Sequence, residues 1–356
     1  MAAVAIAVSF FVIIVAVAVT SGFRHTIRQG VAAMTGDIRI APLVSGSSEP
    51  VSMPRHLPGE KDILSLPGVK EIVPAVVRAG IVKNGDIVHG VIVKGTERAD
   101  SALAVSIPHR LREITGLGVG DDLTVYFVGE KVRVRKFRIS EVHRDLMELD
   151  DNLLVYAGIE DMQRLNGWSS EEVSCLDIFT DALAPESLVR SVGPLAEDYY
   201  VSASRQTYPQ VFEWLNLLDF NVFIILFLMT VVAGFNMVSG LLIMLLRNIS
   251  TIGTLKTLGM DDRAVGRLFV RIGAEAVLKG MLIGNALALL FCLIQGTTHL
   301  IPLDPDNYFV SWVPVHVSLP WILAADAVAF LGILALLWLP SRMVAGIDPA
   351  KTVKAD

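Results

Sequence analysis

The chain has 356 residues, of which 53% are hydrophobic and 19% are charged, and its formal net charge is -6. This composition is too apolar for an average soluble protein and too polar for membrane spans without a further domain. The acidic balance and the lack of a Lys/Arg block argue against a nucleic-acid partner, because phosphate binding needs a concentrated basic surface. Cys175 and Cys292 lie in different regions, so no intrachain disulfide is expected.

The first apolar stretch, residues 2–20, carries no charge. It is long enough to cross a hydrocarbon core of about 30 Å as a helix. A secretory signal with a cleavage site near residues 16–18 is the alternative. Because the stretch has no basic segment before it and is long for a signal core, we expect a retained membrane anchor.

Residues 37–214 predict a mixed α and β domain. Asn84-Gly85 lies between two β-branched pairs, which predicts a two-residue hairpin because both turn positions favour positive φ. A second hairpin is predicted around Gly129-Glu130, and a short helix over residues 159–165. The domain contains none of the short motifs of metal, phosphate or nucleophile sites, so we expect no catalytic residue, no metal and no cofactor.

Three further apolar stretches follow, at residues 220–246, 280–301 and 319–339. The loop between the second and third spans is rich in Arg and Lys, whereas residues 295–317 contain neither. Short loops rich in these residues stay in the cytoplasm, so the first loop is expected inside and the second outside. Alternation then places residues 22–216 outside and both termini in the cytoplasm.

The cytoplasmic loop after residue 246 predicts a short amphipathic helix. Ile249, Ile252 and Leu255 form an apolar stripe roughly 120° wide, and polar side chains gather on the other side. Gly259 is expected to end this helix, and Asp261 to begin the next. The pattern has two interpretations: a helix lying on lipid headgroups, or one that binds a cytoplasmic partner protein.

Polar residues also occur within or beside the apolar stretches. Glu275 and Lys279 are four residues apart and predict a helical salt bridge. Asp326 lies about two turns into the fourth span, where an unpaired carboxylate is costly. It is expected to face the bundle interior or a neighbouring subunit, as a functional group or as a structural contact. Asn236 and Asn285 are expected to make interhelical hydrogen bonds.

Several segments occur in an informative order. Residues 235–240 read FNMVSG, residues 252–260 read IGTLKTLGM, residues 302–305 read PLDP and residues 347–350 read IDPA. They resemble the second span, the coupling segment, the external loop and the C-terminus of FtsX-like ABC permeases, a family that includes the MacB exporters and the lipoprotein-releasing (Lol) permeases. The external loop is similar to that of the Lol branch. Thr251 departs from the pattern, since many family members have Glu there.

The resemblance implies a membrane protein: a four-helix transmembrane permease with a large, MacB-like α+β periplasmic domain inserted between spans 1 and 2. The expected parts are, in order, transmembrane helix 1 (1–21), the periplasmic domain (22–216), transmembrane helix 2 (217–246), the cytoplasmic coupling segment (247–271), transmembrane helix 3 (272–301), a periplasmic loop (302–317), transmembrane helix 4 (318–340) and a cytoplasmic tail (341–356).

The resemblance also implies partners and a site. The coupling helix is expected to bind a cytoplasmic ABC ATPase, because this sequence has no phosphate-binding loop of its own and is expected to be a non-catalytic transport subunit. A second permease copy or a related permease is expected beside it. The expected docking residues are Ile249, Ile252, Gly253, Leu255, Lys256, Leu258 and Gly259.

In the Lol branch, such a permease of the bacterial inner membrane extracts outer-membrane-directed lipoproteins and hands them to a periplasmic carrier. The resemblance therefore implies lipoproteins, a carrier and membrane lipids as partners. Two alternatives remain open. One is an FtsX-like mechanical regulator of a periplasmic cell-wall hydrolase. The other is a MacB-like permease of a tripartite export pump, which the lack of an ATPase domain ahead of the first span disfavours.

Overall fold

The structure is a computed structural model, and it describes residues 2–43, 50–97, 102–129, 132–143, 153–181, 185–248, 251, 254 and 257–345. The chain divides into two compact units. Unit 1 comprises Met1–His25, Trp214–Pro302 and Trp312–Asp356. Unit 2 comprises Thr26–Glu213 and Leu303–Ser311.

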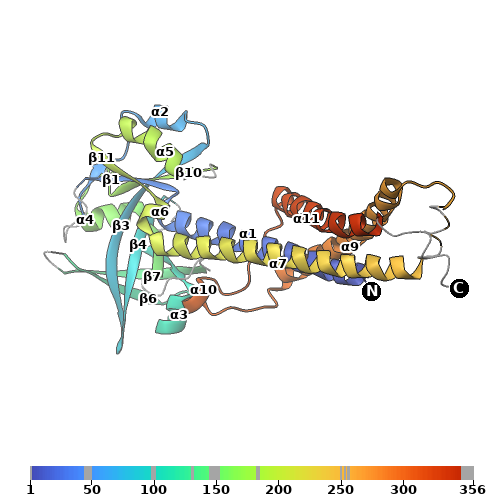
Figure 1. The fold of residues 1–356 in the computed structure, drawn as a ribbon. Coiled ribbons are helices and arrows are strands. Elements are labelled where there is room, and N and C mark those ends of the chain that lie inside the picture. The colour runs from blue at the N-terminus through green and yellow to red at the C-terminus, as the bar shows by residue number, and fades with distance from the viewer. Residues whose placement is uncertain are drawn as a thin grey trace. The chain divides into compact units, whose positions relative to one another are not determined.

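Four helices are long and apolar enough to cross a membrane, in agreement with the four predicted spans. They are α1 (Ala2–Thr35), α7 (Pro209–Arg247), α9 (Asp262–Thr298) and α11 (Leu319–Ala345) (Figure 1). Between α1 and α7 the chain forms an α+β domain. The protein is therefore a membrane protein of the predicted fold class.

All four helices are longer than the predicted spans, and the sequence explains the ends of two of them. Helix α1 continues past residue 21 because the sequence has no proline before Gly36. It ends where Gly36 adopts a φ of 66° and its N–H donates to the Ala32 carbonyl at 2.7 Å, a glycine C-cap. Helix α7 begins at Pro209, whose missing N–H and fixed φ suit the first helical position.

The helices of unit 1 approach closely at small residues. A Cβ at Gly284 of α9 would lie 2.5 Å from the Ala7 carbonyl oxygen of α1, and a Cβ at Gly234 of α7 would overlap Leu336 of α11. Between membrane helices such contacts replace the hydrophobic driving force that water would supply. The fully buried side chains of unit 1 include Ile6, Phe10, Ile13 and Ile14 of α1 and Ile333 of α11.

Unit 2 is built on a sheet whose nine described strands run in the order β11-β1-β10-β3-β4-β8-β5-β7-β6, beside a pair β2-β9. The strands are β1 (Ile38–Pro42), β2 (Met53–Pro54), β3 (Val69–Asn84), β4 (Ile87–Thr96), β5 (Ala104–Pro108), β6 (Asp122–Phe127), β7 (Arg133–His143), β8 (Leu153–Gly158), β9 (Glu172–Val173), β10 (Cys175–Thr180) and β11 (Tyr199–Ala203). The shorter helices are α2 (Glu60–Leu64), α3 (His109–Thr115), α4 (Ile159–Asn166), α5 (Pro185–Val192), α6 (Ser204–Thr207) and α10 (Pro305–Tyr308), with a 3₁₀ turn at Gly193–Leu195.

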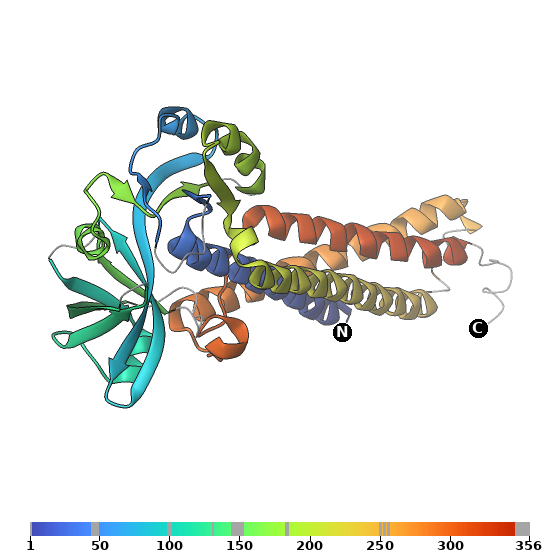
Figure 2. The same cartoon turned by 90° about the vertical axis from the view of Figure 1, so that its left-hand side faces the viewer.

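Strand β3 belongs to two parts of this sheet. Its first half pairs with β10, from Val69 to Ala75, and its second half pairs with β4, from Val76 to Asn84. A further pairing of β3 with β6 closes the ring β3-β4-β8-β5-β7-β6. Figure 2 shows β3 running as one long strand through unit 2.

Both predicted hairpins are present. In the first, Asn84 pairs with Ile87, so the two-residue turn is Gly85-Asp86 and lies one residue later than predicted. Gly85 has the expected positive φ of 59°. Asn84 stays in the strand, where its side chain donates to the Thr115 carbonyl at 2.9 Å. In the second hairpin β6 and β7 pair antiparallel, and α4 ends at Gly167 with a φ of 76°.

Gly95 tests how tightly α4 packs on β4. A Cβ there would lie 2.8 Å from the Met162 Cγ and 3.2 Å from the Ile159 Cα of α4. We expect Gly95→Ala to lower the free energy of unfolding by about 1–3 kcal/mol, as overpacking does. Gly90→Ala, on the same strand but with nothing within 4 Å, should change it by less than about 0.5 kcal/mol. Pulse proteolysis across a urea series in detergent measures both, and equal losses would contradict close packing at Gly95.

Candidate functional site

The predicted docking segment lies between α7 and α9. Ile249, Ile252, Gly253, Leu255 and Lys256 fall outside the described residues. Of the other two, Gly259 has a φ of 97° and Leu258 is 79% exposed.

The described ends of this segment follow the predicted pattern. Gly259 lies in the left-handed region at the end of a helical turn, whose Leu258 N–H donates to the Thr254 carbonyl at 3.1 Å. Asp261 is then the N-cap of α9, and its carbonyl accepts from the Ala264 and Val265 N–H groups. An acid at this position complements the positive end of the helix dipole. The segment that links α7 to α9 is therefore short, and it exposes the apolar side chain of Leu258.

The intramembrane polar residues differ in their surroundings. Asn285 of α9 donates from Nδ2 to Asp326 Oδ2 of α11 at 2.6 Å, the kind of interhelical bond expected of it. Asp326 is 7% exposed and faces the bundle interior. Asn236 is exposed on α7, and among the described residues it bonds to no other helix. In the middle of α9, Lys279 pairs with Glu275 at 2.8 Å, as predicted.

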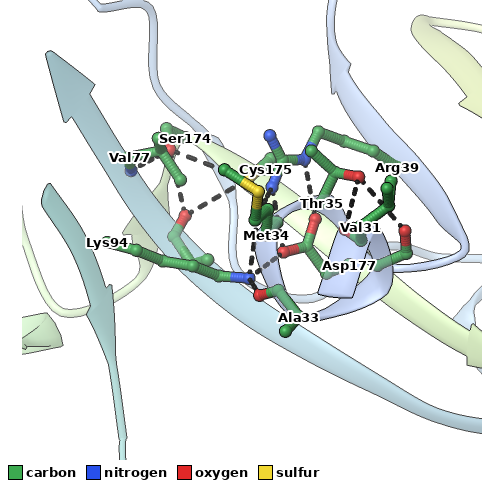
Figure 3. Close-up of polar contacts among 12 residues, drawn as sticks. Val31, Ala33, Met34, Thr35, Arg39, Val77, Lys94, Ser174, Cys175 and Asp177 are labelled. Carbon is green, nitrogen blue, oxygen red and sulfur yellow. Dashed lines mark hydrogen bonds and ion pairs between the residues drawn. The ribbon is translucent and has the colours of Figure 1, made fainter. Parts of the chain in front are cut away.

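A buried ion cluster in unit 2 was not predicted from the sequence. Asp177 of β10 is 0% exposed, and its two carboxylate oxygens accept from Arg39 Nε at 2.7 Å and Arg39 Nη2 at 3.0 Å. The Lys94 Nζ lies 2.7 Å from Asp177 Oδ2. Figure 3 shows the two cations on either side of the carboxylate.

The same two cations hold the end of helix α1. Lys94 Nζ donates to the carbonyls of Ala33 at 3.0 Å and Met34 at 3.2 Å. Arg39 Nη2 also donates to the Met34 carbonyl, at 2.9 Å (Figure 3). The last carbonyls of a helix lack intrahelical donors and carry about half a negative charge. The cluster has one more positive than negative side chain, and the helix end takes up that excess.

The charges in this cluster compensate each other's burial. Burial raises the pKa of the Asp177 carboxyl, but the opposing effect of Arg39 and Lys94 is larger, so that its pKa lies below its ordinary value. The neighbouring Cys175 is a small buried residue, as expected, and burial raises the pKa of its thiol. Asp177 is therefore ionised, and Cys175 does not have the thiolate character of a reactive cysteine.

Asp37 adds a second attachment. Its Oδ1 accepts from Arg28 of α1 at 3.2 Å, and its Oδ2 accepts from the Thr180 N–H of β10 at 3.0 Å. Its carbonyl accepts from the Ser204 N–H of α6 at 2.9 Å. The chain from Arg28 to Arg39 is thus fixed to the sheet by side-chain and main-chain bonds together.

A weak sequence signal marks the cluster. Arg39, Lys94 and Asp177 are single charges within short apolar strands, as in VIVKG and CLDIF. Such a charge is almost never buried unless it is paired. Pairing over more than a hundred residues cannot be read from one sequence, so the signal identifies candidates without their partners.

Comparison with known proteins finds a family match in the C-terminal part of the chain. Residues 223–349 match the family model described as FtsX-like permease C-terminal, which covers α9, α11 and most of α7. This part of the chain is similar to the C-terminal domain of FtsX-like permeases. The predicted family resemblance is confirmed, and the permease domain together with four membrane-capable helices makes this a multi-pass membrane protein.

Curated relatives extend the similarity over nearly the whole chain. The lipoprotein-releasing system transmembrane protein LolE of Haemophilus influenzae is 24% identical over 397 residues, covering 99% of this chain and 93% of the relative. The protein LolC of Xylella fastidiosa is 24% identical over 399 residues, covering 99% and 92%. The protein LolC of Neisseria meningitidis is 22% identical, also over 99% of this chain. These relatives and the family model support a permease subunit of an ABC transporter.

Among solved structures, the periplasmic region of MacB from Actinobacillus actinomycetemcomitans is similar at 14% identity and a TM-score of 0.31, covering 52% of this chain and 95% of that chain. The extracellular domain of the transporter YknZ from Gram-positive bacteria is similar at 12% identity and a TM-score of 0.30, covering 46% of this chain and 98% of that chain.

The buried cluster predicts a large cost for Asp177→Asn. Breaking a buried ion pair by removing one partner leaves an uncompensated charge and costs about 3–5 kcal/mol. The matched control is Asp181→Asn, which removes the same charge from a pair with Lys70 at the surface of unit 2 and should have little effect. Pulse proteolysis of the purified proteins compares the stabilities of the two variants. An Asp177→Asn protein as stable as the Asp181→Asn control would contradict a stabilising role for the buried ion cluster.

The cluster also predicts an acid-sensitive component of stability. Because the folded pKa of Asp177 is lowered, its contribution is fully present above the ordinary carboxyl pKa of about 3.9 and is lost as pH falls through the lowered value. The native protein should lose this component in acid, whereas Asp177→Asn should not have it. Unfolding of both proteins across a pH series measures the difference, and parallel pH profiles would count against the assignment.

Proposed function

We propose that this chain is a permease subunit of an ABC transporter of the bacterial inner membrane, and that it extracts outer-membrane-directed lipoproteins for transfer to a periplasmic carrier. The observation that carries the proposal is the near full-length similarity to relatives named as lipoprotein-releasing system transmembrane proteins. The FtsX-like permease domain at residues 223–349 supports the transporter part. ATP hydrolysis then belongs to a separate cytoplasmic ATPase, and this chain has no catalytic role.

The proposed sidedness follows the charges. The segment between α7 and α9 is rich in Arg and Lys, and residues 295–317 have neither, which favours a cytoplasmic segment and an external loop. Both termini are then cytoplasmic, and residues 22–216 are periplasmic.

The helices offer a path for force in this proposal. Helix α7 is one continuous helix of 39 residues, and it ends at Arg247 beside the docking segment. At 1.5 Å per residue it is about 58 Å long. An ATPase that pushes on residues 249–259 would displace this end of α7, and a continuous helix carries the displacement to Pro209. At the C-terminal end of α1, the buried cluster of Arg39, Lys94 and Asp177 holds the last turn of the helix on the sheet within unit 2.

The exposed face of α7 supports a second permease beside this one. Phe220, Phe223, Phe227 and Phe235 are exposed at helical spacing. Lipid can cover these phenylalanines, whereas Asn236 is exposed on another side of α7, roughly 100° around the helix from Phe235, and an amide facing hydrocarbon is costly. A helix of a second copy, or of a related permease, would give this amide a hydrogen-bonding partner. We propose Asn236 as an interface residue on this basis.

Leu255→Asp tests the docking assignment. A carboxylate in the centre of the apolar stripe should abolish association with the ATPase, because its burial at the interface would leave an unpaired charge. Co-purification of the ATPase from detergent extracts measures this. Thr251→Glu is the control: it adds a charge of the same sign on the polar side and introduces the acid that many family members have there. Undiminished co-purification with Leu255→Asp would contradict docking through this stripe.

Depletion of the protein tests the substrate. If the proposal holds, lipoproteins destined for the outer membrane should accumulate in the inner membrane, as measured by membrane fractionation and immunoblotting. Re-expression of the wild-type chain should restore sorting, whereas Leu255→Asp should not. Normal sorting combined with unseparated cells would favour the alternative role in cell-wall hydrolysis, and normal sorting combined with defective export would favour the tripartite pump.

A further inference from the structure

The strongest unassigned feature is the polar pair between α9 and α11. The Asn285 amide donates one hydrogen bond to Asp326 Oδ2 at 2.6 Å. The other oxygens of the pair, Asn285 Oδ1 and Asp326 Oδ1, are buried and accept no hydrogen bond from any described residue. Two buried acceptors side by side on one interacting pair need a donor, because an unsatisfied buried polar atom is costly.

Apolar residues lie beside the pair on α11 and pack against the neighbouring Gly284 from α1. Asp326 lies on the buried face of α11 with Ile322, Ala325 and Ala329. Gly284, the neighbour of Asn285, packs on Ala7 and Phe10 of α1. Seven residues separate Asp326 from the start of α11 at Leu319, about 10 Å along the helix axis. The pair therefore lies inside the helix packing of unit 1.

The apolar stretches of the four helices also provide no opposite charge. Residues 2–23, 220–246 and 280–298 contain no Asp, Glu, Lys, Arg or His, and Asp326 is the sole such residue in 319–340. The nearest cation in the sequence of α9 is Lys279, which pairs with Glu275 at 2.8 Å. Cys292, the other titratable group in these stretches, lies about two turns beyond Asn285. An ionised Asp326 would therefore be a buried charge without a counter-ion.

We propose that Asp326 and Asn285 form an intramembrane proton-binding site. A proton on Asp326 Oδ1 makes the carboxyl neutral and turns this oxygen into a donor toward Asn285 Oδ1. One edge of an amide and a carboxylic acid each present one donor and one acceptor, so the two groups bond twice, face to face. One bound proton thus removes the buried charge and satisfies both remaining oxygens. The inference goes beyond the proposed function and depends on no step of it.

With the proton bound, the pair forms an uncharged connection between α9 and α11. Two hydrogen bonds hold the helices in one register, and loss of the proton replaces one bond with repulsion between two acceptor oxygens. A buried charge costs several kcal/mol even after relaxation, so release of the proton requires these helices to separate or water to enter. The site thereby links proton release to the packing of the third and fourth spans.

Infrared spectroscopy of the full-length protein in lipid nanodiscs at pH 7 tests the protonation state. The difference between the native protein and Asp326→Asn should contain the carbonyl stretch of a protonated carboxylic acid, shifted by deuterium exchange. In Asn285→Leu this band should move to higher frequency, because the acid loses its hydrogen-bonding partner. A difference spectrum that contains the stretches of an ionised carboxylate would overturn the proposal, whether water or a partner's cation supplies the donor.

Thermal unfolding gives an independent readout. Asp326→Asn keeps a neutral group of the same shape that can bond twice to Asn285, so its midpoint should equal that of the native protein. Asp326→Leu leaves the amide without a partner, and its midpoint should fall. An Asp326→Asn protein that does not fold, or one destabilised as much as Asp326→Leu, would contradict a neutral acid at this position.

Discussion

The attachment of α1 to unit 2 depends on one fully buried carboxylate. Asp177 positions Arg39 and Lys94, and these two cations satisfy the last carbonyls of the helix. The carboxylate, the two cations and the helix end depend on one another. Without Asp177 the two cations would be unpaired and would not stay buried, and without the cations the last carbonyls of the helix would lack donors. The arrangement joins an apolar helix, which the sequence makes suitable for lipid, to a sheet that has the core of a soluble domain. Within unit 2, the last turn of α1 is therefore fixed to the sheet by these bonds.

Local chemistry in the sequence was enough to predict several elements, whereas the full fold class was what the family resemblance implied. The four spans, the two hairpins and the glycine at the end of α4 follow from apolar length, β-branched runs and turn residues, which act over a few positions. The first hairpin turn was displaced by one residue because Asn84 has a tertiary partner in Thr115. Helices α1 and α7 exceed the predicted spans because hydropathy marks the apolar part of a helix, whereas a glycine and a proline mark its ends.

The candidate sites also divide into those set by local sequence and those formed by residues far apart in the chain. The salt bridge between Glu275 and Lys279 is local and was predictable. Asp326 was expected to seek a buried partner, but only the packing of α11 on α9 identifies that partner as Asn285. The cluster around Asp177 joins three strands and a helix that are far apart in the chain, so no pattern within one segment describes it. For the docking segment the family resemblance remains the main argument, because most of its expected contact residues lie outside the described part of the chain.

Strand β3 has a mechanical consequence for unit 2. Its 16 residues serve both the β10 side and the closed ring, so neither part can lose its pairing without releasing a strand that the other needs. The ladders on either side of β3 are antiparallel, and a pull along the strand loads many hydrogen bonds at once in shear. Bonds loaded together resist force better than bonds opened one at a time. A pull along β3 would thus act on both ladders of the domain together.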